Sequence, residues 1–259
     1  MRKQVADDKM VEYATADDGV RLAYETAGGG SHAIVLVHGF ASDRNQNWKN
    51  VGWYETLTGA GRRVVAMDCR GHGMSDKPHD DGAYGDKMVS DILAVMDAAG
   101  LRRADVMGYS MGGILSVGLL MTHPERIARA VLAGIGETYF ASKSHRRGIA
   151  DALRAADPSS ITDPTQKAFR AFASQGGKDL LALAACMSAD RTMYAREQLK
   201  TCRRPVLVVD GSKDTQSGAP EPLAQAFLDG RAVVVPDRDH MTAVGDKVYK
   251  AAVLAFLQG

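Results

Sequence analysis

Residues 104–113, with the sequence Ala-Asp-Val-Met-Gly-Tyr-Ser-Met-Gly-Gly, constrain this chain more than any other stretch. Their first half is typical of a short apolar strand, and an apolar helix is expected to follow. Gly108 and Gly112 flank Ser110 in a turn so tight that a Cβ at either position would crowd the strand or the helix. Such a turn holds the serine oxygen above the sheet, at the positive end of the helix. The pattern Gly-x-Ser-x-Gly in this setting predicts a nucleophile elbow, although a glycine-rich packing turn would look similar.

Apolar strands and helical patterns alternate along most of the chain. A hairpin is expected from strands at 11–15 and 20–26, and a helix bearing Trp48, Trp53, Tyr54 and Leu57 near its start is expected further on. Further apolar strands are expected at 33–37, 63–67, 127–133, 205–209 and 232–235, and helices at 87–98, 221–228 and 247–257. Continuous apolar strands that alternate with helices are typical of a parallel sheet with helices on both faces.

The alternation stops between about residues 136 and 200, where only helical patterns occur. This insertion cannot belong to the sheet, so we expect a helical cap over its C-terminal edge. The predicted division is a core of residues 1–135 and 201–259 and a cap of residues 136–200. Apolar side chains of the cap face either its own core or a ligand, and the core is favoured for most of them: Phe169, Phe172, Leu180, Leu181, Leu183, Met187, Met193 and Tyr194.

The composition argues against several classes of function. Lys and Arg number 32 against 31 Asp and Glu, and this net charge of +1 gives no electrostatic basis for binding nucleic acid or a membrane surface. No apolar run is long enough to span a membrane, and no secretory signal follows the charged start. Cys69, Cys186 and Cys202 form no metal or redox pattern. We therefore expect a cytoplasmic protein with no metal and no organic cofactor.

A serine hydroxyl needs a base within hydrogen-bond distance to act as a nucleophile. Open α/β sheets bind ligands beyond the carboxyl ends of their strands, so the base is expected in a loop at that edge. His240 follows the last strand and is the predicted base, whereas His38 lies in a tight turn where a structural role is expected. The remaining histidines are expected to order loops or to lie away from the site: His32, His72, His79, His123 and His145.

The imidazole in turn needs a carboxylate that fixes its tautomer and stabilises its charged form. The strand ending at residue 209 is followed by Asp210 and, past a glycine turn, by Asp214. Asp214 is the predicted acid, and Asp210 and Glu137 remain alternatives. Asp239 precedes His240 directly, and neighbouring side chains in an extended loop point apart, so a structural role is expected for it.

With these residues identified, the sequence resembles the α/β-hydrolase superfamily. The order Ser110, Asp214, His240 is the nucleophile–acid–histidine order of that family. The segment 38–40, His-Gly-Phe, resembles the family segment whose third residue, here Phe40, supplies one oxyanion-hole amide. Met111, directly after the nucleophile, would supply the other.

The resemblance also implies a fold. The turn Asp68-x-Arg70-Gly71-x-Gly73-x-Ser75 resembles one in the family's smaller esterases, lactonases and carbon–carbon bond hydrolases, where it is mainly structural. The implied α/β-hydrolase fold has a mostly parallel eight-stranded sheet with helices on both faces and a helical cap insertion.

The activity implied by the resemblance is cleavage of a small or medium-sized carboxylic ester through an acyl-enzyme, with a small-molecule ester as partner. Ser110, where dehalogenases and epoxide hydrolases carry aspartate, argues against their chemistries. Phe40 leaves little room near the acyl carbonyl and favours modest acyl groups. One alternative is hydrolysis of a lactone or of a carbon–carbon bond in a ring-fission product. The cap arginines Arg146, Arg147 and Arg191 would be its candidate clamps, although solvated surface is favoured for each. The other alternative is a ligand receptor or signalling partner with a retained triad.

Overall fold

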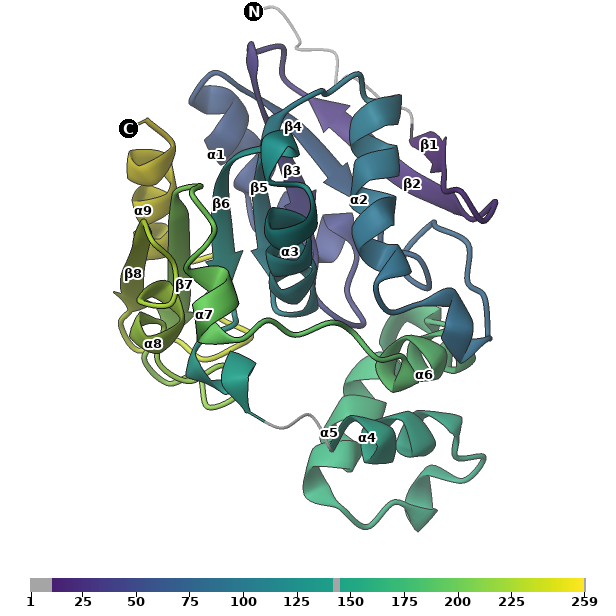
Figure 1. The fold of residues 1–259 in the computed structure, drawn as a ribbon. Helices are drawn as coiled ribbons and strands as arrows, with labels where there is room; N and C mark the ends of the chain where they lie inside the picture. Colours follow the sequence, from purple (N-terminus) through teal and green to yellow (C-terminus); the bar gives the residue numbers. More distant parts are fainter. Residues whose placement is uncertain (1–10, 142–144, 259) are drawn as a thin grey trace, which may run out of the picture.

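The computed structural model describes residues 11–141 and 145–258 and contains an eight-stranded sheet (Figure 1). The strands are β1 (Glu12–Thr15), β2 (Arg21–Ala27), β3 (His32–Val37), β4 (Arg62–Met67), β5 (Ala104–Tyr109), β6 (Ile127–Ala133), β7 (Val206–Gly211) and β8 (Gly230–Val235). Their order in the sheet is β1-β2-β4-β3-β5-β6-β7-β8. β2 pairs antiparallel with β1 and β4, and the pairs from β4 to β8 are all parallel. The mostly parallel eight-stranded sheet expected from the sequence is confirmed.

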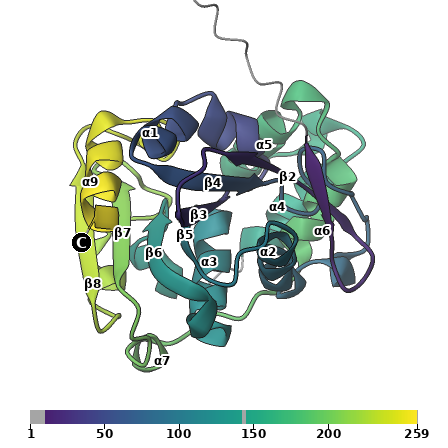
Figure 2. The same cartoon turned by 90° about the horizontal axis from the view of Figure 1, so that it is seen from above.

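Helices cover both faces of this sheet, as the view from above shows (Figure 2). α2 (Lys87–Ala98) and α3 (Met111–Thr122) lie on one face, and α1 (Trp53–Gly59) and α9 (Lys247–Gln258) on the other. Successive side chains of a strand point to opposite faces. β3 therefore contributes Val35 and Val37 to the core under α2 and α3, and Ile34 and Leu36 to the core under α1 and α9. This burial on both sides explains the unbroken apolar run.

Two expected helices differ in the structure. The helix expected around Trp48 and Trp53 is in two parts, a π-helical turn at Asn45–Lys49 and then α1. Gly52 separates them with a φ of 78°, a left-handed conformation that a continuous helix cannot contain. The helix expected at 221–228 ends early, as α8 (Glu221–Ala224). Beyond it the amides of Ala226 and Phe227 bond to carbonyls three residues back rather than four, which tightens the chain into turns.

The chain between β6 and β7 forms helices α4 (His145–Arg154), α5 (Pro164–Ala173), α6 (Leu180–Ser188) and α7 (Arg196–Leu199). Figure 1 shows α4 and α5 beyond the ends at which the parallel strands terminate. A small separate core joins α4, α5 and α6, with Ile149, Leu153, Ala173 and Leu183 buried in it and Phe40 packed against it. The helical character of this insertion agrees with the expectation, and its boundaries at 136 and 200 stay a prediction. None of the helices in the described ranges is long and apolar enough to cross a membrane.

The turn after β4 is held by buried charges. The Arg70 guanidinium donates to both carboxylate oxygens of Asp91 on α2, at 2.6 and 2.5 Å. Asp68 accepts the N–H groups of Arg44 and Met74, each at 2.8 Å, and also forms an ion pair with the Arg44 guanidinium. These contacts fasten the turn to the loop that follows β3, so a structural role for the turn fits its observed contacts.

Candidate active site

Ser110 occupies a strained turn between β5 and α3. Its φ of 54° and ψ of −115° lie in a region that residues with a side chain rarely adopt. The Ser110 N–H donates to the Ala133 carbonyl on β6 at 2.7 Å, which fixes the turn to the sheet. A Cβ on Gly112 would lie 2.0 Å from the Val37 carbonyl oxygen, and one on Gly108 would lie 2.2 Å from the Gly112 carbonyl oxygen. Glycine is therefore required at both positions by close backbone approach.

Ser110, His240 and Asp214 meet at the carboxyl edge of the sheet, in the segments that follow β5, β8 and β7. His240 Nε2 lies 3.0 Å from Ser110 Oγ, and His240 Nδ1 lies 2.7 Å from Asp214 Oδ2. With its proton on Nδ1, the ring donates to the carboxylate and accepts from the serine hydroxyl. This is the arrangement in which a histidine takes a proton from a serine that attacks a carbonyl.

Asp214 is held as a carboxylate. Its side chain is fully buried, and its Oδ1 accepts the N–H groups of Gln216 at 2.9 Å and Ser217 at 3.1 Å. Burial by itself raises the pKa of Asp214. The hydrogen bond and charge of His240, together with the bonds from Ser217, outweigh burial and leave this pKa below its ordinary value. Asp214 is therefore ionised at neutral pH and stabilises a protonated His240.

The alternative acids are placed differently. Asp210 is the penultimate residue of β7, and both of its carboxyl oxygens are buried and without a hydrogen-bond partner among the described residues. Burial raises the pKa of Asp210 to about 8, and the negative charge of Asp214 adds to the rise. Asp239 accepts the N–H groups of Met241 and Thr242, at 3.0 and 2.9 Å, and so closes a turn. Glu137 begins a short 3₁₀ helix, and no hydrogen bond joins it to His240.

Tyr109, the residue before Ser110, contacts His240 through its hydroxyl and its ring. Its hydroxyl donates to the His240 backbone carbonyl at 2.7 Å, and the two rings lie 5.5 Å apart between centroids. Sequence reasoning missed this residue. Its hydroxyl was the available signal, because a buried tyrosine hydroxyl usually needs a hydrogen-bond partner.

The loop after β3 is fastened by two side chains. His38 Nδ1 donates to the Gly39 carbonyl at 2.7 Å, and His38 Nε2 accepts the Cys69 N–H at 2.9 Å. Burial lowers the pKa of His38 despite the opposing charge of Asp68, so this ring stays neutral and structural, as expected. Asn47, which sequence reasoning also missed, accepts the Gly39 N–H on Oδ1 at 3.0 Å.

The N–H groups of Phe40 and Met111 are available to bind an oxygen atom. Neither donates a hydrogen bond to another group in residues 11–141 or 145–258. Met111 is the first residue of α3, where the N–H groups have no intrahelical partner and the helix end is positive. The Phe40 N–H follows the fastened Gly39 in the neighbouring loop. The two amides remain the predicted oxyanion hole.

A cavity of about 440 Å³ opens at Ser110 and His240. The wall of this cavity is mostly apolar. Besides Ser110 and His240, the residues that line it are Gly39, Phe40, Ser42, Gln46, Asn47, Val51, Tyr109, Ala168, Phe169, Phe172, Gln216, Met241 and Val244. In the described part of the chain, no lysine, arginine, aspartate or glutamate lines this cavity. Phe169 and Phe172 of α5 face the ligand space, whereas Leu183 and Met187 are buried in the core of the insertion.

The cap arginines differ from expectation. Arg146 and Arg191 are half-buried rather than solvated, because their guanidinium groups bond to main-chain carbonyls of the insertion. Arg146 donates to Ala189 at 3.0 Å, and Arg191 donates to Cys186 at 3.1 Å. Arg147 is exposed as expected. None of the three lines the cavity at Ser110.

Two further histidines hold loops in place. His72 donates to the Arg70 carbonyl at 2.9 Å and His79 pairs with Asp179 at 2.9 Å, so both order loops as expected. Within the residues that the structure describes, no group of three or more His, Cys, Asp or Glu side chains is placed to hold a metal ion.

Comparison with known proteins identifies relatives along nearly the whole chain. A family model described as alpha/beta hydrolase fold matches residues 32–150. The dihydrolipoyllysine-residue acetyltransferase component of the acetoin cleaving system from Pseudomonas putida is 31% identical, over 94% of this chain and 68% of that protein. Matches to 2-hydroxy-6-oxononadienedioate/2-hydroxy-6-oxononatrienedioate hydrolases, such as that of Paraburkholderia xenovorans at 31% identity, cover 51% of this chain. They span only 46% of the relative, less than half its length.

Solved structures show the same fold. The crystal structure of a hydrolase from Pseudomonas aeruginosa PA01 has a TM-score of 0.81 and 28% identity, covering 98% of this chain and 100% of that one. The enol-lactonase from Burkholderia xenovorans LB400 has a TM-score of 0.72 and 26% identity, covering 96% and 100%. The similarity therefore includes the helical insertion as well as the sheet.

The neutral form of Asp210 predicts an unusual dependence of stability on pH. The pKa of Asp210 is about 8 in the folded chain, whereas that of an exposed aspartate is 3.8. At pH values between these two, the folded state therefore holds a proton on Asp210 that the unfolded state has released. The free energy of unfolding contributed by this group therefore falls as pH rises from 4 to 8. Asp210→Asn stays neutral and should raise the free energy of unfolding at pH 8 by about 1–4 kcal/mol, with a smaller gain at pH 5. Urea unfolding at both pH values measures the effect. The exposed Asp151→Asn serves as control, and a loss of stability at pH 8 for Asp210→Asn would contradict the assignment.

Proposed function

Because this chain belongs to the α/β-hydrolase family, we propose that it is a serine hydrolase that cleaves a carboxylic ester of a small or medium-sized molecule through an acyl-enzyme. One observation carries the proposal, the hydrogen-bonded chain from Ser110 Oγ to His240, at 3.0 Å, and from His240 to Asp214, at 2.7 Å. A serine activated by a histidine, with an ionised carboxylate behind it, is a nucleophile for acyl groups.

In the proposed reaction Ser110 Oγ attacks the ester carbonyl while His240 Nε2 takes the hydroxyl proton. The carbonyl oxygen becomes an oxyanion that accepts the N–H groups of Phe40 and Met111, at about 3–4 kcal/mol of transition-state stabilisation per donor. His240 then gives the proton to the departing alcohol. A water molecule, deprotonated by His240, attacks the acyl-enzyme and releases the acid. Asp214 holds the imidazole in place and stabilises its charge throughout.

The cavity at Ser110 favours an uncharged substrate. Phe40, Phe169 and Phe172 offer apolar surface, while Gln46 and Gln216 offer neutral hydrogen-bonding groups. A carboxylate placed against this wall would lose its hydration without gaining a cation. The volume of about 440 Å³ lies in the range of small-molecule sites.

A neighbouring cavity of about 500 Å³ shares Ser42 and Gln46 with the cavity at Ser110. Unlike that cavity, it is lined by charged side chains. Its charges are balanced, with Lys77 and Lys178 against Asp43 and Asp179. Lys178 also places its ammonium 4.6 Å from the centre of the Phe172 ring. This compartment therefore adds polar volume without a net positive charge.

Among the alternatives, a lactone fits the same site, because it is a neutral ester within a ring and one similar structure is an enol-lactonase. Hydrolysis of a carbon–carbon bond in a ring-fission product is less well supported. Such substrates usually need a cationic group or an extra polar clamp, and Arg146, Arg147 and Arg191 lie outside the cavity lining. The receptor alternative predicts slow turnover and a binding partner.

Replacement of the nucleophile tests the proposal directly. Ser110→Ala should abolish turnover of p-nitrophenyl butyrate, because within residues 11–141 and 145–258 no other hydroxyl is bonded to His240 Nε2. The melting temperature of the Ser110→Ala variant should stay within a few degrees of that of the native protein. The surface variant Ser174→Ala should keep full activity. Native protein without rapid turnover, or activity retained by Ser110→Ala, would refute the esterase assignment.

Replacement of Asp214 and of Asp210 in turn identifies the acid. Asp214→Asn should lower kcat by about 10⁴, because an amide cannot hold the histidine tautomer or stabilise its charge. Asp210→Asn, four residues earlier in β7, is the matched control, and it should lower kcat by less than about tenfold because Asp210 is already neutral. Steady-state kinetics on the same ester measure both. A larger loss from Asp210→Asn than from Asp214→Asn would reverse the two roles.

Substrate charge tests the character of the cavity. The neutral p-nitrophenyl butyrate should have a kcat/KM at least about tenfold higher than that of p-nitrophenyl hemisuccinate, whose acyl chain ends in a carboxylate. Lys178→Gln should leave this ratio unchanged if the cation stays outside the acyl site. Equal or faster turnover of the carboxylate ester would instead favour the ring-fission alternative.

A further inference from the structure

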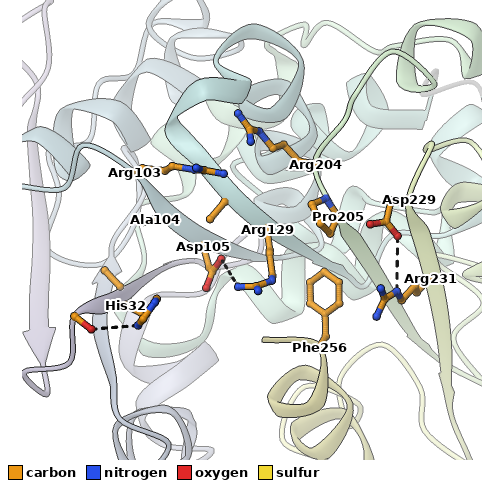
Figure 3. Close-up of a pocket in the computed structure, with 13 residues that line it drawn as sticks. His32, Arg103, Ala104, Asp105, Arg129, Arg204, Pro205, Asp229, Arg231 and Phe256 are labelled. Atoms are coloured by element: carbon orange, nitrogen blue, oxygen red, sulfur yellow. Dashed lines mark hydrogen bonds and ion pairs between the residues drawn. The ribbon is translucent and has the colours of Figure 1, made fainter. Parts of the chain in front are cut away.

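Figure 3 shows a separate cavity, which has a volume of about 560 Å³ and lies at the amino end of β5, away from Ser110. Ala104, the first residue of β5, lines it, whereas Ser110 directly follows the last residue of that strand. The two cavities share no lining residue. Six strand residues at 3.3 Å each separate them by roughly 20 Å, so a ligand here takes no part in chemistry at Ser110.

The lining of this second cavity is strongly basic. Its charged lining residues are four arginines, Arg103, Arg129, Arg204 and Arg231, and two aspartates, Asp105 and Asp229. The net charge of this lining is therefore higher than the +1 of the whole chain. The two acids are already engaged. Asp105 forms a buried ion pair with Arg62 and lies 3.9 Å from Arg129. Asp229 lies 3.8 Å from Arg231, as the dashed line in Figure 3 shows.

Two of the arginines are fastened but carry unused donors. Arg204 Nε donates to the Pro124 carbonyl at 2.7 Å, and Arg103 Nε donates to the Ile127 carbonyl at 3.3 Å. Both guanidinium groups are therefore held against one short turn, and Figure 3 shows them on the same side of the cavity. Their Nη groups have no hydrogen-bond or ion-pair partner within residues 11–141 and 145–258.

We propose that this cavity binds the phosphate group of a small phosphorylated molecule, with Arg103 and Arg204 as its two clamps. A guanidinium offers paired N–H donors that match two oxygens of one anion, and two such groups match the several oxygens and the double charge of a phosphate. A carboxylate has only two oxygens and a single charge, so one guanidinium is enough for it. The apolar body of the ligand would lie against Pro205 and Phe256, which line the same cavity.

The cavity favours a small molecule over a macromolecule. Its volume lies in the range of small-molecule sites, and its basic groups line a hollow rather than a flat face. The near-zero net charge of the chain gives no long-range attraction to a polyanion. The inference is independent of the reaction proposed at Ser110.

Isothermal titration calorimetry of the full chain with inorganic pyrophosphate, at an ionic strength held constant with KCl, tests the site. Native protein should show saturable binding of one pyrophosphate. The double variant Arg103→Gln/Arg204→Gln should bind at least about tenfold more weakly, because both clamps lose their charge. Arg147→Gln, at an exposed arginine of α4, should bind like the native protein. The double variant should keep a native melting temperature, which shows that it is folded.

Three results would overturn the proposal. The first is the absence of saturable binding by the folded native protein. The second is an equal loss of affinity in Arg147→Gln, which would mean that binding reflects charge in general. The third is saturable binding of an oligoglutamate peptide without binding of pyrophosphate, which would assign the surface to an acidic protein segment instead.

Discussion

The hydrogen bond from the Ser110 N–H to the Ala133 carbonyl fixes the turn on which the site depends. A residue with a side chain at a φ of 54° costs about 1–3 kcal/mol, so the surrounding structure must hold it. Gly112 allows this by letting α3 approach the end of β3, where any side chain would clash. The strain and the close approach together raise the hydroxyl above the sheet edge, where His240 can contact it.

Two aspartates four residues apart show how the surroundings select a role. Asp210 lies near the end of β7, Asp214 follows that strand, and both are buried. Asp214 receives hydrogen bonds from His240 and from two backbone amides, which favour its charged form. Asp210 receives none, and burial favours its neutral form. An aspartate side chain is therefore suited to stabilise a protonated histidine at position 214 and is not suited to do so at position 210.

The two ends of the parallel strands differ in chemical character. At the carboxyl edge a mostly apolar, uncharged cavity surrounds the serine, as suits acyl transfer from a neutral ester. At the amino edge four arginines, on or just before strands β5 to β8, line another cavity. The Nη groups of Arg103 and Arg204 have no partner among the described residues. β5 connects the two, since its first residue lines one cavity and the residue after its last carries the nucleophile. The proposed chemistry and the proposed anion binding therefore belong to opposite edges of one sheet.

The sequence by itself determined the sheet, its central order of strands and helices, and the turn at Ser110, because strand burial and glycine requirements are local. The position of His240 also followed from sequence, since parallel strands bring their carboxyl ends to one edge. Sequence favoured Asp214 as the acid and left Asp210 and Glu137 as alternatives. Only the tertiary structure separated them, because a carboxylate's role depends on partners distant in the chain. It also decided the support from Tyr109 and Asn47, the half-buried state of Arg146 and Arg191, and the break at Gly52. The physical reason is that hydrogen-bond partners, burial and nearby charges come from segments far apart in the chain, and no local pattern records them. Tyr109 and His240, for example, are 131 residues apart.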